Sequence, residues 1–176
     1  MEEKESFLAR TIRWMSHDVK VCMAGDAYVG AMTLMMTDIA ALAGFYAGRE
    51  DGKPKPSDHD EFVVFFEEFF DLAKDPRYDQ LIYEVKKGKN KCVIYDDFRC
   101  GLAHEHLMKV GTAIDKGLEK PYVFMSPAGL TINIDLFYAD YMNALAKYAD
   151  RIRNDVTVAN NFIKRAKHLG AYQPYI

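Results

Sequence analysis

The sequence predicts a mainly α-helical protein, an up-and-down helical bundle with one small inserted β-hairpin. Three observations favour this class: an apolar stripe of helical spacing over residues 8–22, an almost wholly apolar segment at residues 27–47, and a second helical stripe over residues 137–152. A chain of 176 residues is long enough to bury a core. We therefore expect residues 1–176 to form a single domain of long helices.

The first predicted helix has one continuous apolar face. Its members recur at spacings of four and three, as expected for side chains on one side of a helix: Leu8, Ile12, Met15, Val19 and Cys22. Gly25 and Asp26 then end the pattern.

Residues 27–47 predict a second helix that is apolar on nearly all sides. The segment is close to the ~20 residues that span a bilayer. It contains Asp38, Thr33 and Thr37, however, and amphipathic segments flank it. We interpret it as the central helix of the bundle, buried on most sides, and expect no membrane association.

The middle of the chain begins with a polar loop at residues 48–57, which holds Pro54 and Pro56. A helix with an aromatic face follows, and core packing explains that face: Phe62, Phe65, Phe66, Phe69 and Phe70. Further along, Leu81, Ile82 and Val85 predict a short helix that ends at Gly88.

The β-hairpin is predicted at residues 122–134. Residues 122–125 and 130–134 are rich in strand-forming types, and Ser-Pro-Ala-Gly between them is typical of a turn. Asp135 then opens a helix whose pattern continues to about Leu169, with a break near Asn160 and Asn161. Its apolar face consists of Phe137, Tyr141, Ala144, Tyr148 and Ile152.

Charge and cysteine content narrow the class of protein. The chain has 23 basic and 26 acidic residues, a formal charge of -3, which disfavours a general nucleic-acid binder but permits a local basic patch. Its cysteines, Cys22, Cys92 and Cys100, are odd in number and irregularly spaced, so we expect no disulfide framework. The first residues lack the features of a secretion signal. A reduced, cytoplasmic protein is expected.

The stretch from Phe98 to Glu105 holds the strongest indication of chemistry. It places Arg99 and His104 four intervening residues apart in a helix-like, mostly apolar region. A permanent cation beside an imidazole that titrates near neutrality is suited to phosphodiester cleavage. On an ideal helix these side chains lie ~140° apart. For both to face one cleft, the long arginine has to curl or Gly101 has to loosen the helix.

Residues 95–105, with the sequence YDDFRCGLAHE, resemble the R-x(4–6)-H motif of the HEPN superfamily, with Arg99 as the arginine and His104 as the histidine. The aromatic residue before the arginine and the small residues before the histidine match the motif's usual setting. HEPN domains are helical bundles that commonly dimerise, which suits the helices expected here. This chain carries Cys100 where many members have a polar residue, often asparagine.

The resemblance implies a metal-independent endoribonuclease that uses no cofactor. In that family the histidine assists attack of a ribose 2′-hydroxyl on the adjacent phosphate, and the arginine stabilises the developing charge. General-base catalysis of this kind contributes ~10²–10⁴-fold. Two chains would pair so that both motifs face one cleft, and we therefore expect a homodimer that acts on RNA.

Two other functions stay open. The chief rival is a non-catalytic helical dimer that binds a nucleotide or a protein partner. A third possibility is a toxin that an antitoxin-type protein partner neutralises.

Other residues suggest additional roles. A lysine run, Lys86, Lys87, Lys89 and Lys91, leads into the motif; as an entry strip for an RNA backbone, Lys89 and Lys91 would bind substrate, and binding would weaken with salt. A solvated turn explains the run equally well. Asp38 needs a partner if it is buried, either on another helix or Arg99 itself.

Two alternative sites share the same stretch. Cys100 and His104 are neighbours at i, i+4 and would form a thiolate–imidazolium pair, although no third orienting residue is visible. Several potential metal ligands also lie there, but no H-E-x-x-H or paired Cys-x-x-Cys pattern appears, and we expect no metal: Asp96, Asp97, His104, Glu105 and His106.

Overall fold

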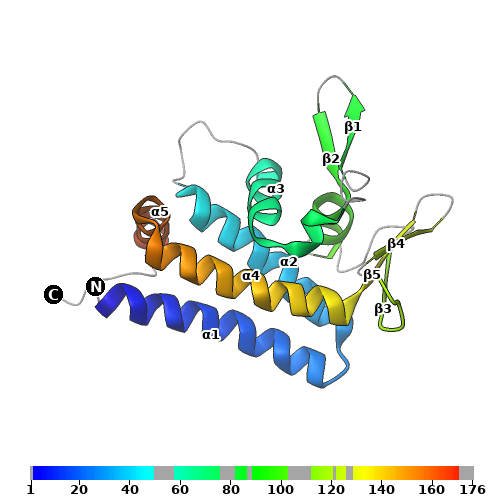
Figure 1. Cartoon of the computed structure of the whole chain (residues 1–176), viewed down its shortest axis with the longest axis horizontal. Helices are drawn as coiled ribbons and strands as arrows, with labels where there is room; N and C mark the ends of the chain where they lie inside the picture. Colours follow the sequence, from blue (N-terminus) through cyan, green and yellow to red (C-terminus); the bar gives the residue numbers. More distant parts are fainter. Residues whose placement is uncertain are drawn as a thin grey trace.

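Long helices make up most of the fold in the computed structural model, which describes residues 2–49, 58–75, 82–86, 89–102, 112–120, 122–125 and 129–170. Within these ranges the α-helices are α1 (Glu2–Ala24), α2 (Tyr28–Ala47), α3 (Asp58–Phe69), α4 (Ile134–Asn154) and α5 (Val156–His168). In Figure 1, α1 and α4 run antiparallel along the molecule, α3 lies on the opposite side of α4 from α1, and α5 crosses the end remote from the strands. The predicted mainly α class is confirmed.

Helix α1 buries the apolar face that the sequence predicts. Leu8 and Val19 are fully buried, and the other stripe residues pack against the core. The helix ends at Ala24, and Asp26 adopts a positive φ of 55°, a conformation that aspartate tolerates better than most residues. The sharp turn leads directly into α2, which packs antiparallel to α1.

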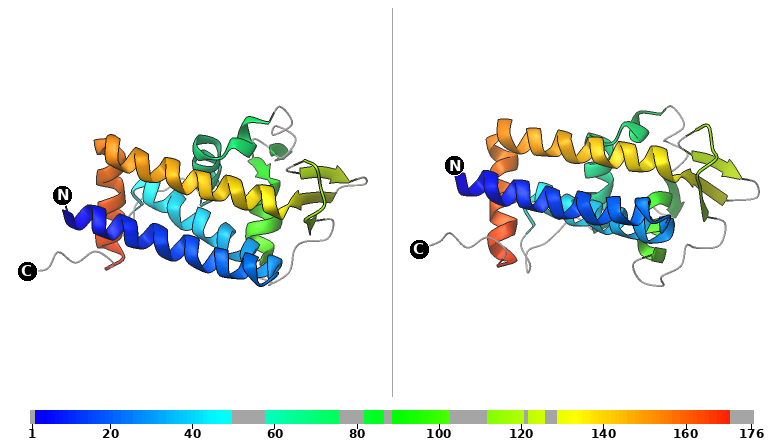
Figure 2. Two further views of the ribbon diagram at one scale, coloured as in Figure 1. Left: turned by 60° about the horizontal axis from the view of Figure 1, so that its bottom comes forward. Right: turned by 90° about the horizontal axis from the view of Figure 1, so that it is seen from below.

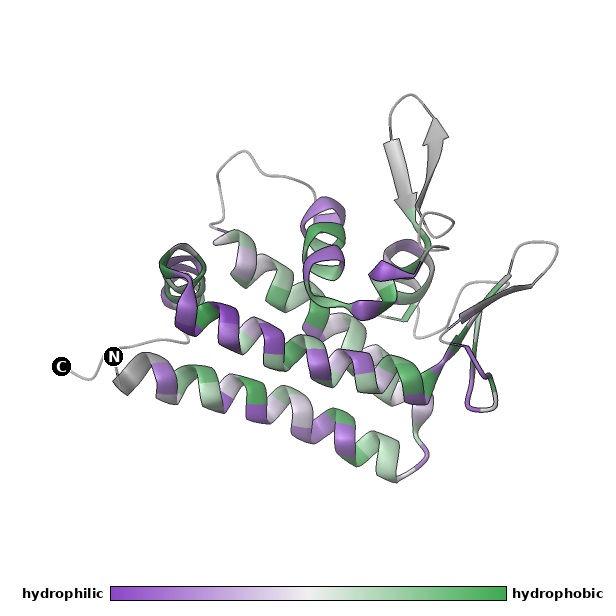
Figure 3. Cartoon of the chain, in the orientation of Figure 1, coloured by the Kyte–Doolittle hydropathy of each residue, from purple (hydrophilic) through white to green (hydrophobic). Residues whose placement is uncertain are grey.

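Helix α2 is the centre of the bundle. It contacts all four other α-helices, and its buried residues come from most sides of the helix: Ala31, Met32, Met35, Met36, Ile39, Leu42, Ala43, Gly44 and Phe45. By length and composition α2 is apolar enough to cross a membrane, and 50% of its most apolar window is buried within the fold, as in a core helix. Figure 3 shows how α2 differs from α4 in hydropathy: α4 alternates hydrophilic and hydrophobic stripes, while α2 is mostly pale or green.

Gly48 ends α2 with a left-handed residue. Its φ is +66°, its N–H bonds to the Phe45 carbonyl, and the following N–H of Arg49 bonds to the Gly44 carbonyl. A Cβ at Gly48 would lie 2.6 Å from the Asn161 side-chain oxygen of α5. Glycine is therefore required both by the backbone and by the close approach of α5.

The aromatic face of α3 packs into the core, as predicted. Phe62, Phe65 and Phe66 are at most 1% exposed, and the Phe65 ring meets Tyr148 of α4 edge-on, with centroids 5.3 Å apart. Phe66 and Phe70 stack with their centroids 4.3 Å apart. The short helix η1 (Asp71–Lys74) follows and packs against α4.

The predicted hairpin forms strands β4 (Tyr122–Met125) and β5 (Gly129–Asn133), which pair antiparallel. It is part of a larger sheet, because β3 (Thr112–Asp115) pairs parallel to the other edge of β5 in the order β3-β5-β4. Strand β3 was not predicted from the sequence, because no hairpin turn joins its four residues to the strand with which they pair. Asn133 closes β5 and caps α4, its side chain accepting the Leu136 N–H at 3.0 Å.

The prediction of a short helix that ends at Gly88 is wrong. Residues 82–86 form strand β1 (Ile82–Lys86), which pairs antiparallel with β2 (Lys89–Cys92) as a second hairpin. Apolar residues at positions 82 and 85 have the spacing of one helical turn, whereas on a strand they face opposite sides. The β-branched and aromatic content of Ile-Tyr-Glu-Val, together with a neighbouring strand, favours the extended form.

The C-terminal helix breaks at Asp155, so the break predicted near Asn160 and Asn161 is wrong. The Asp155 side chain accepts the N–H of Thr157 at 2.9 Å and of Val158 at 3.2 Å, which caps α5. Asn161 lies inside α5 and donates to the Tyr46 carbonyl at 2.9 Å. Asn161, one of the two asparagines that suggested a break, instead ties α5 to α2.

Candidate functional site

Arg99 lies at the end of η3 (Ile94–Arg99), a π-helical segment whose helical backbone continues through the described residues to Leu102. Wide turns of this type are frequent at functional sites. The side chain is partly buried, and its Cζ lies 5.2 Å from the centre of the Tyr95 ring, one turn earlier. The helix therefore presents Arg99 as a cation stacked on an aromatic face.

The structure does not describe the side chains of the other predicted site residues. His104, Glu105 and His106 lie outside the described residues. Lys89 and Lys91 lie on β2, where the backbones pair with Lys86 and Tyr83, but their side chains fall outside the described part. The convergence of Arg99 and His104 stays a prediction.

His59 is the residue that the sequence reading missed. It lies in the first turn of α3, and its Nε2 accepts the Cys92 backbone N–H at 3.1 Å, where β2 leads into η3. The His59 ring meets the Tyr95 ring edge-on, with centroids 5.2 Å apart. Because Nε2 accepts a hydrogen bond, this geometry belongs to the neutral tautomer with its proton on Nδ1, which faces Asp60 Oδ1 at 3.2 Å.

Asp96 completes the group. Its Oδ2 is buried, lies 3.7 Å from His59 Nε2, and has no hydrogen-bond donor among the described residues. Since the His59 Nε2 already accepts the Cys92 N–H, it offers no proton to this oxygen. A buried carboxylate oxygen without a donor is uncommon, which makes Asp96 an unusual feature of this site.

Tyr95 holds these side chains together. Its ring is buried and packs against two rings of α3, those of Phe62 and His59. It also contacts the Arg99 guanidinium. Burial raises the pKa of the Tyr95 phenol, and the positive charge of Arg99 acts in the opposite direction. The phenol is therefore a neutral platform at physiological pH. Together His59, Tyr95, Asp96 and Arg99 form what we call the Arg99 cluster.

A second arginine stabilises the same end of α3. Arg49 bonds Glu61 through Nε at 2.7 Å and also through Nη2, which lies 2.9 Å from Asp58 Oδ1. The hydrogen bond that Arg49 donates to Glu61 is the main cause that raises the pKa of Arg49, which remains charged. This guanidinium is paired with two carboxylates of α3. Its role is therefore to fix the start of α3 beside the Arg99 cluster.

Cys22, Cys92 and Cys100 are free thiols. Burial raises the pKa of Cys92 to about 12, so it stays protonated. Cys100 is partly buried, with its Sγ 3.9 Å from Arg99 Nη1. The proposed partner of Cys100, His104, lies outside the described residues. Among the residues that the structure describes, no group of three histidine, cysteine or acidic side chains is placed to hold a metal ion.

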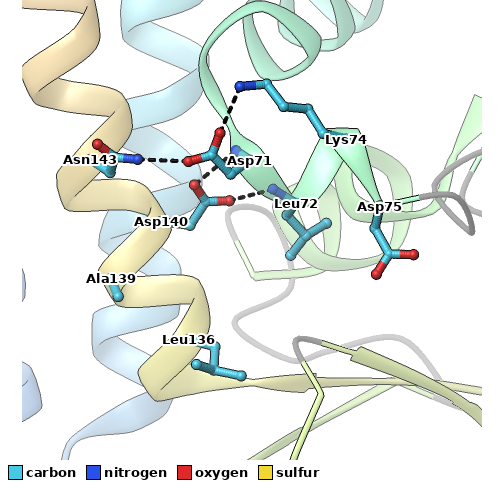
Figure 4. Close-up of a pocket in the computed structure, with 8 residues that line it drawn as sticks. All are labelled: Asp71, Leu72, Lys74, Asp75, Leu136, Ala139, Asp140 and Asn143. Atoms are coloured by element: carbon cyan, nitrogen blue, oxygen red, sulfur yellow. Dashed lines mark hydrogen bonds and ion pairs between the residues drawn. The ribbon is translucent and has the colours of Figure 1, made fainter.

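A surface hollow of about 570 Å³ between η1 and α4 is lined by both charged and aliphatic side chains (Figure 4). Asp140 of α4 accepts the N–H groups of Asp71 at 2.8 Å and Leu72 at 2.7 Å. Asp71 in turn accepts hydrogen bonds from Lys74, Lys147 and Asn143. The lysines, Lys147 first, lower the pKa of Asp71 to about 2, whereas burial raises the pKa of Asp140. Both carboxylates accept hydrogen bonds from donors of the chain itself. Asp71 and Asp140 therefore hold η1 against α4.

Comparisons of the chain with protein-family models, with curated proteins and with solved structures found no match.

Proposed function

We propose that this chain is a metal-independent endoribonuclease of HEPN type, with Arg99 and His104 as its catalytic residues. The observation that carries the proposal is the setting of Arg99, a guanidinium stacked on Tyr95 at one end of a helical segment, in the motif that also supplies His104. A guanidinium held this way binds two non-bridging phosphate oxygens at once.

The proposed reaction needs no metal. His104 takes the proton of the ribose 2′-hydroxyl as its oxygen attacks the adjacent phosphorus, and the bond to the 5′-oxygen of the next nucleotide breaks. The proton that this leaving oxygen requires comes from the imidazolium or from water. Arg99 neutralises the extra negative charge on the phosphate oxygens as it develops. The products are a 2′,3′-cyclic phosphate and a 5′-hydroxyl end.

His59 has a different role in this scheme. Its Nε2 is occupied by the Cys92 N–H, so it is a positioning residue that joins the start of α3 to the segment carrying Arg99. Lys89 and Lys91, on the strand that leads into this segment, are the proposed contacts for the RNA backbone. By analogy with the family, two chains pair as a homodimer in the cytoplasm and form one cleft with two motifs.

The test is cleavage of a mixed RNA panel in excess chelator. We expect the native protein to cut, and Arg99→Ala and His104→Ala to lose at least ~10²-fold in rate. Arg99→Lys is the matched control for charge, because lysine keeps the cation but cannot bind two oxygens from a planar group. Equal cutting by His104→Ala and native protein would disprove the proposed base.

Cys100 favours one rival. Its thiol hydrogen-bonds weakly at the position where many family members have an orienting polar residue. A non-catalytic helical dimer that binds a nucleotide, or a protein partner of antitoxin type, would be compatible with this change. Binding of a nucleotide without any cleavage, lost in Arg99→Ala, would favour this rival.

A further inference from the structure

The outer face of α1 combines cations with the chain's single tryptophan. Trp14 is 62% exposed, although a side chain of its size is normally covered. Arg10 and Arg13 lie on the same face at helical spacing, followed one turn later by His17, and all three are exposed. In Figure 2, α1 runs along the outside of the bundle, with α2 and α4 on its inner side.

The arginines of this face differ in their charge partners from Arg49, Arg151 and Arg153. Within the described part of the chain, no carboxylate pairs with Arg10 or Arg13, whereas Arg49, Arg151 and Arg153 each have an acidic partner. The Arg10 guanidinium lies 5.9 Å from the Trp14 ring centre and 5.8 Å from that of Phe7. A chain with a net charge of -3 thus places two arginines beside Trp14, the most exposed aromatic ring among the residues that the structure describes.

A surface hollow of about 540 Å³ follows the same face, lined by Ser6, Ala9, Arg10, Arg13, Trp14 and His17. The small residues at positions 6 and 9 leave room for a ligand beside the ring. A planar ring next to two guanidinium groups is the arrangement with which proteins bind single strands, because bases stack on the ring while cations contact the phosphates.

We propose that this α1 face is a docking surface for single-stranded RNA, in which a base stacks on Trp14 while Arg10 and Arg13 contact the flanking phosphates. Charge complementarity selects a polyanion, and the exposed ring selects one with unpaired bases. The face lies on the opposite side of the bundle from α3 and the Arg99 cluster, so it is a second site (Figure 1). Only the choice of RNA over another single strand rests on the proposed function.

The experiment uses the fluorescence of Trp14, which reports directly because no other tryptophan is present. The full chain is titrated with a 2′-O-methyl oligoribonucleotide, which cannot undergo attack by a 2′-hydroxyl. Binding is therefore measured whether or not the protein cleaves RNA. We expect quenching at low salt, with log affinity falling against log salt by about 0.7 for each phosphate contact.

Variants then locate the contacts. Arg10→Gln and Arg13→Gln should each reduce the salt slope by about 0.7. Trp14→Leu should weaken binding by about tenfold, measured by anisotropy of a labelled oligonucleotide. The matched control is Arg151→Gln, which removes the same charge from an exposed position on α4, where Glu68 pairs with the arginine. It should bind as the native protein does.

Four results would overturn the proposal. They are absence of quenching at low salt, equal loss of affinity in Arg151→Gln, quenching by a blunt RNA duplex as strong as by the single strand, and a response that anionic lipid vesicles produce while the oligonucleotide does not. Self-association that Trp14→Leu abolishes, without any oligonucleotide binding, would instead assign this face to a second copy of the chain. Circular dichroism of each variant confirms that it is folded.

Discussion

Tyr141 of α4 donates a hydrogen bond of 2.7 Å to Asp38 of α2, across 103 positions of the sequence. The expectation that Asp38 has a partner on another helix is thereby confirmed, and the partner is Tyr141 rather than Arg99. Burial raises the pKa of Asp38 from 3.8 to about 6; the Tyr141 hydrogen bond lowers it in part, and the charge of Asp18 raises it. Burial also raises the pKa of Tyr141, which stays protonated as the donor.

This pair makes stability depend on pH. The folded-state pKa of Asp38 lies above that of the unfolded chain, so the folded state binds more protons between pH 3.8 and about 6. Ionisation of Asp38 therefore costs stability above about pH 6, and that cost disappears below pH 3.8. Asp38→Asn keeps an acceptor for Tyr141 and removes the charge. We expect it to raise the free energy of unfolding at pH 8 by up to about 3 kcal/mol.

Urea unfolding at several pH values measures this effect. The stability gain of Asp38→Asn should shrink steadily as the pH falls to 4. Asp18→Asn removes a charge that raises the Asp38 pKa but leaves Asp38 ionisable, so it should reduce the native pH dependence without abolishing it. A gain for Asp38→Asn that is equal at pH 4 and pH 8 would contradict the assignment.

Gly48→Ala should destabilise the protein more than the same change at Gly170. Both glycines have a φ of +66°, but a Cβ at Gly48 would lie 2.6 Å from the Asn161 side chain, while nothing lies within 4 Å at Gly170. The backbone conformation costs an alanine about 1–2 kcal/mol at either position. Thermal unfolding of both variants isolates the additional clash. Equal losses would mean that Asn161 yields without cost.

Asp155→Ala should lower the free energy of unfolding by about 1 kcal/mol, because the α5 N–H groups of Thr157 and Val158 lose their acceptor. Asp150→Ala is the matched control, since it removes the same charge from an exposed position on α4. We expect its effect to be within about 0.5 kcal/mol. Chemical denaturation of the two variants gives the comparison, and a larger loss at Asp150 would exclude the capping role.

His59→Ala should lower stability by about 1–3 kcal/mol, since the Cys92 N–H loses its acceptor. If the chain cleaves RNA, the rate should also fall while its pH profile keeps its shape, because His59 positions Arg99 and is not the base. Partial recovery in His59→Gln, whose amide oxygen accepts hydrogen bonds, would support this role. His168→Ala, an exposed position on α5, serves as the control. Loss of the acidic limb of the profile in His59→Gln would identify His59 as the base instead.

The sequence by itself determined the helices whose signals are local. The stripe from Leu8 to Cys22 and the aromatic face of α3 repeat every three or four residues, and a helix follows from that period wherever the chain lies. The hairpin of β4 and β5 could also be predicted, because the sequence signals of its strands and turn lie next to one another in the chain. The capping residue Asp155 was also a local signal. The apolar stripe continues past it, however, so the break was not predicted at this position.

Tertiary structure decided the contacts between distant residues. The parallel partner of β3 is β5, which lies beyond β4 in the chain. His59 reaches the Cys92 N–H across 33 positions, and Tyr141 reaches Asp38 across 103. Side-chain period and capping depend on neighbours within one or two turns. The partner of a buried polar group depends on how whole helices pack, which no short stretch of sequence encodes.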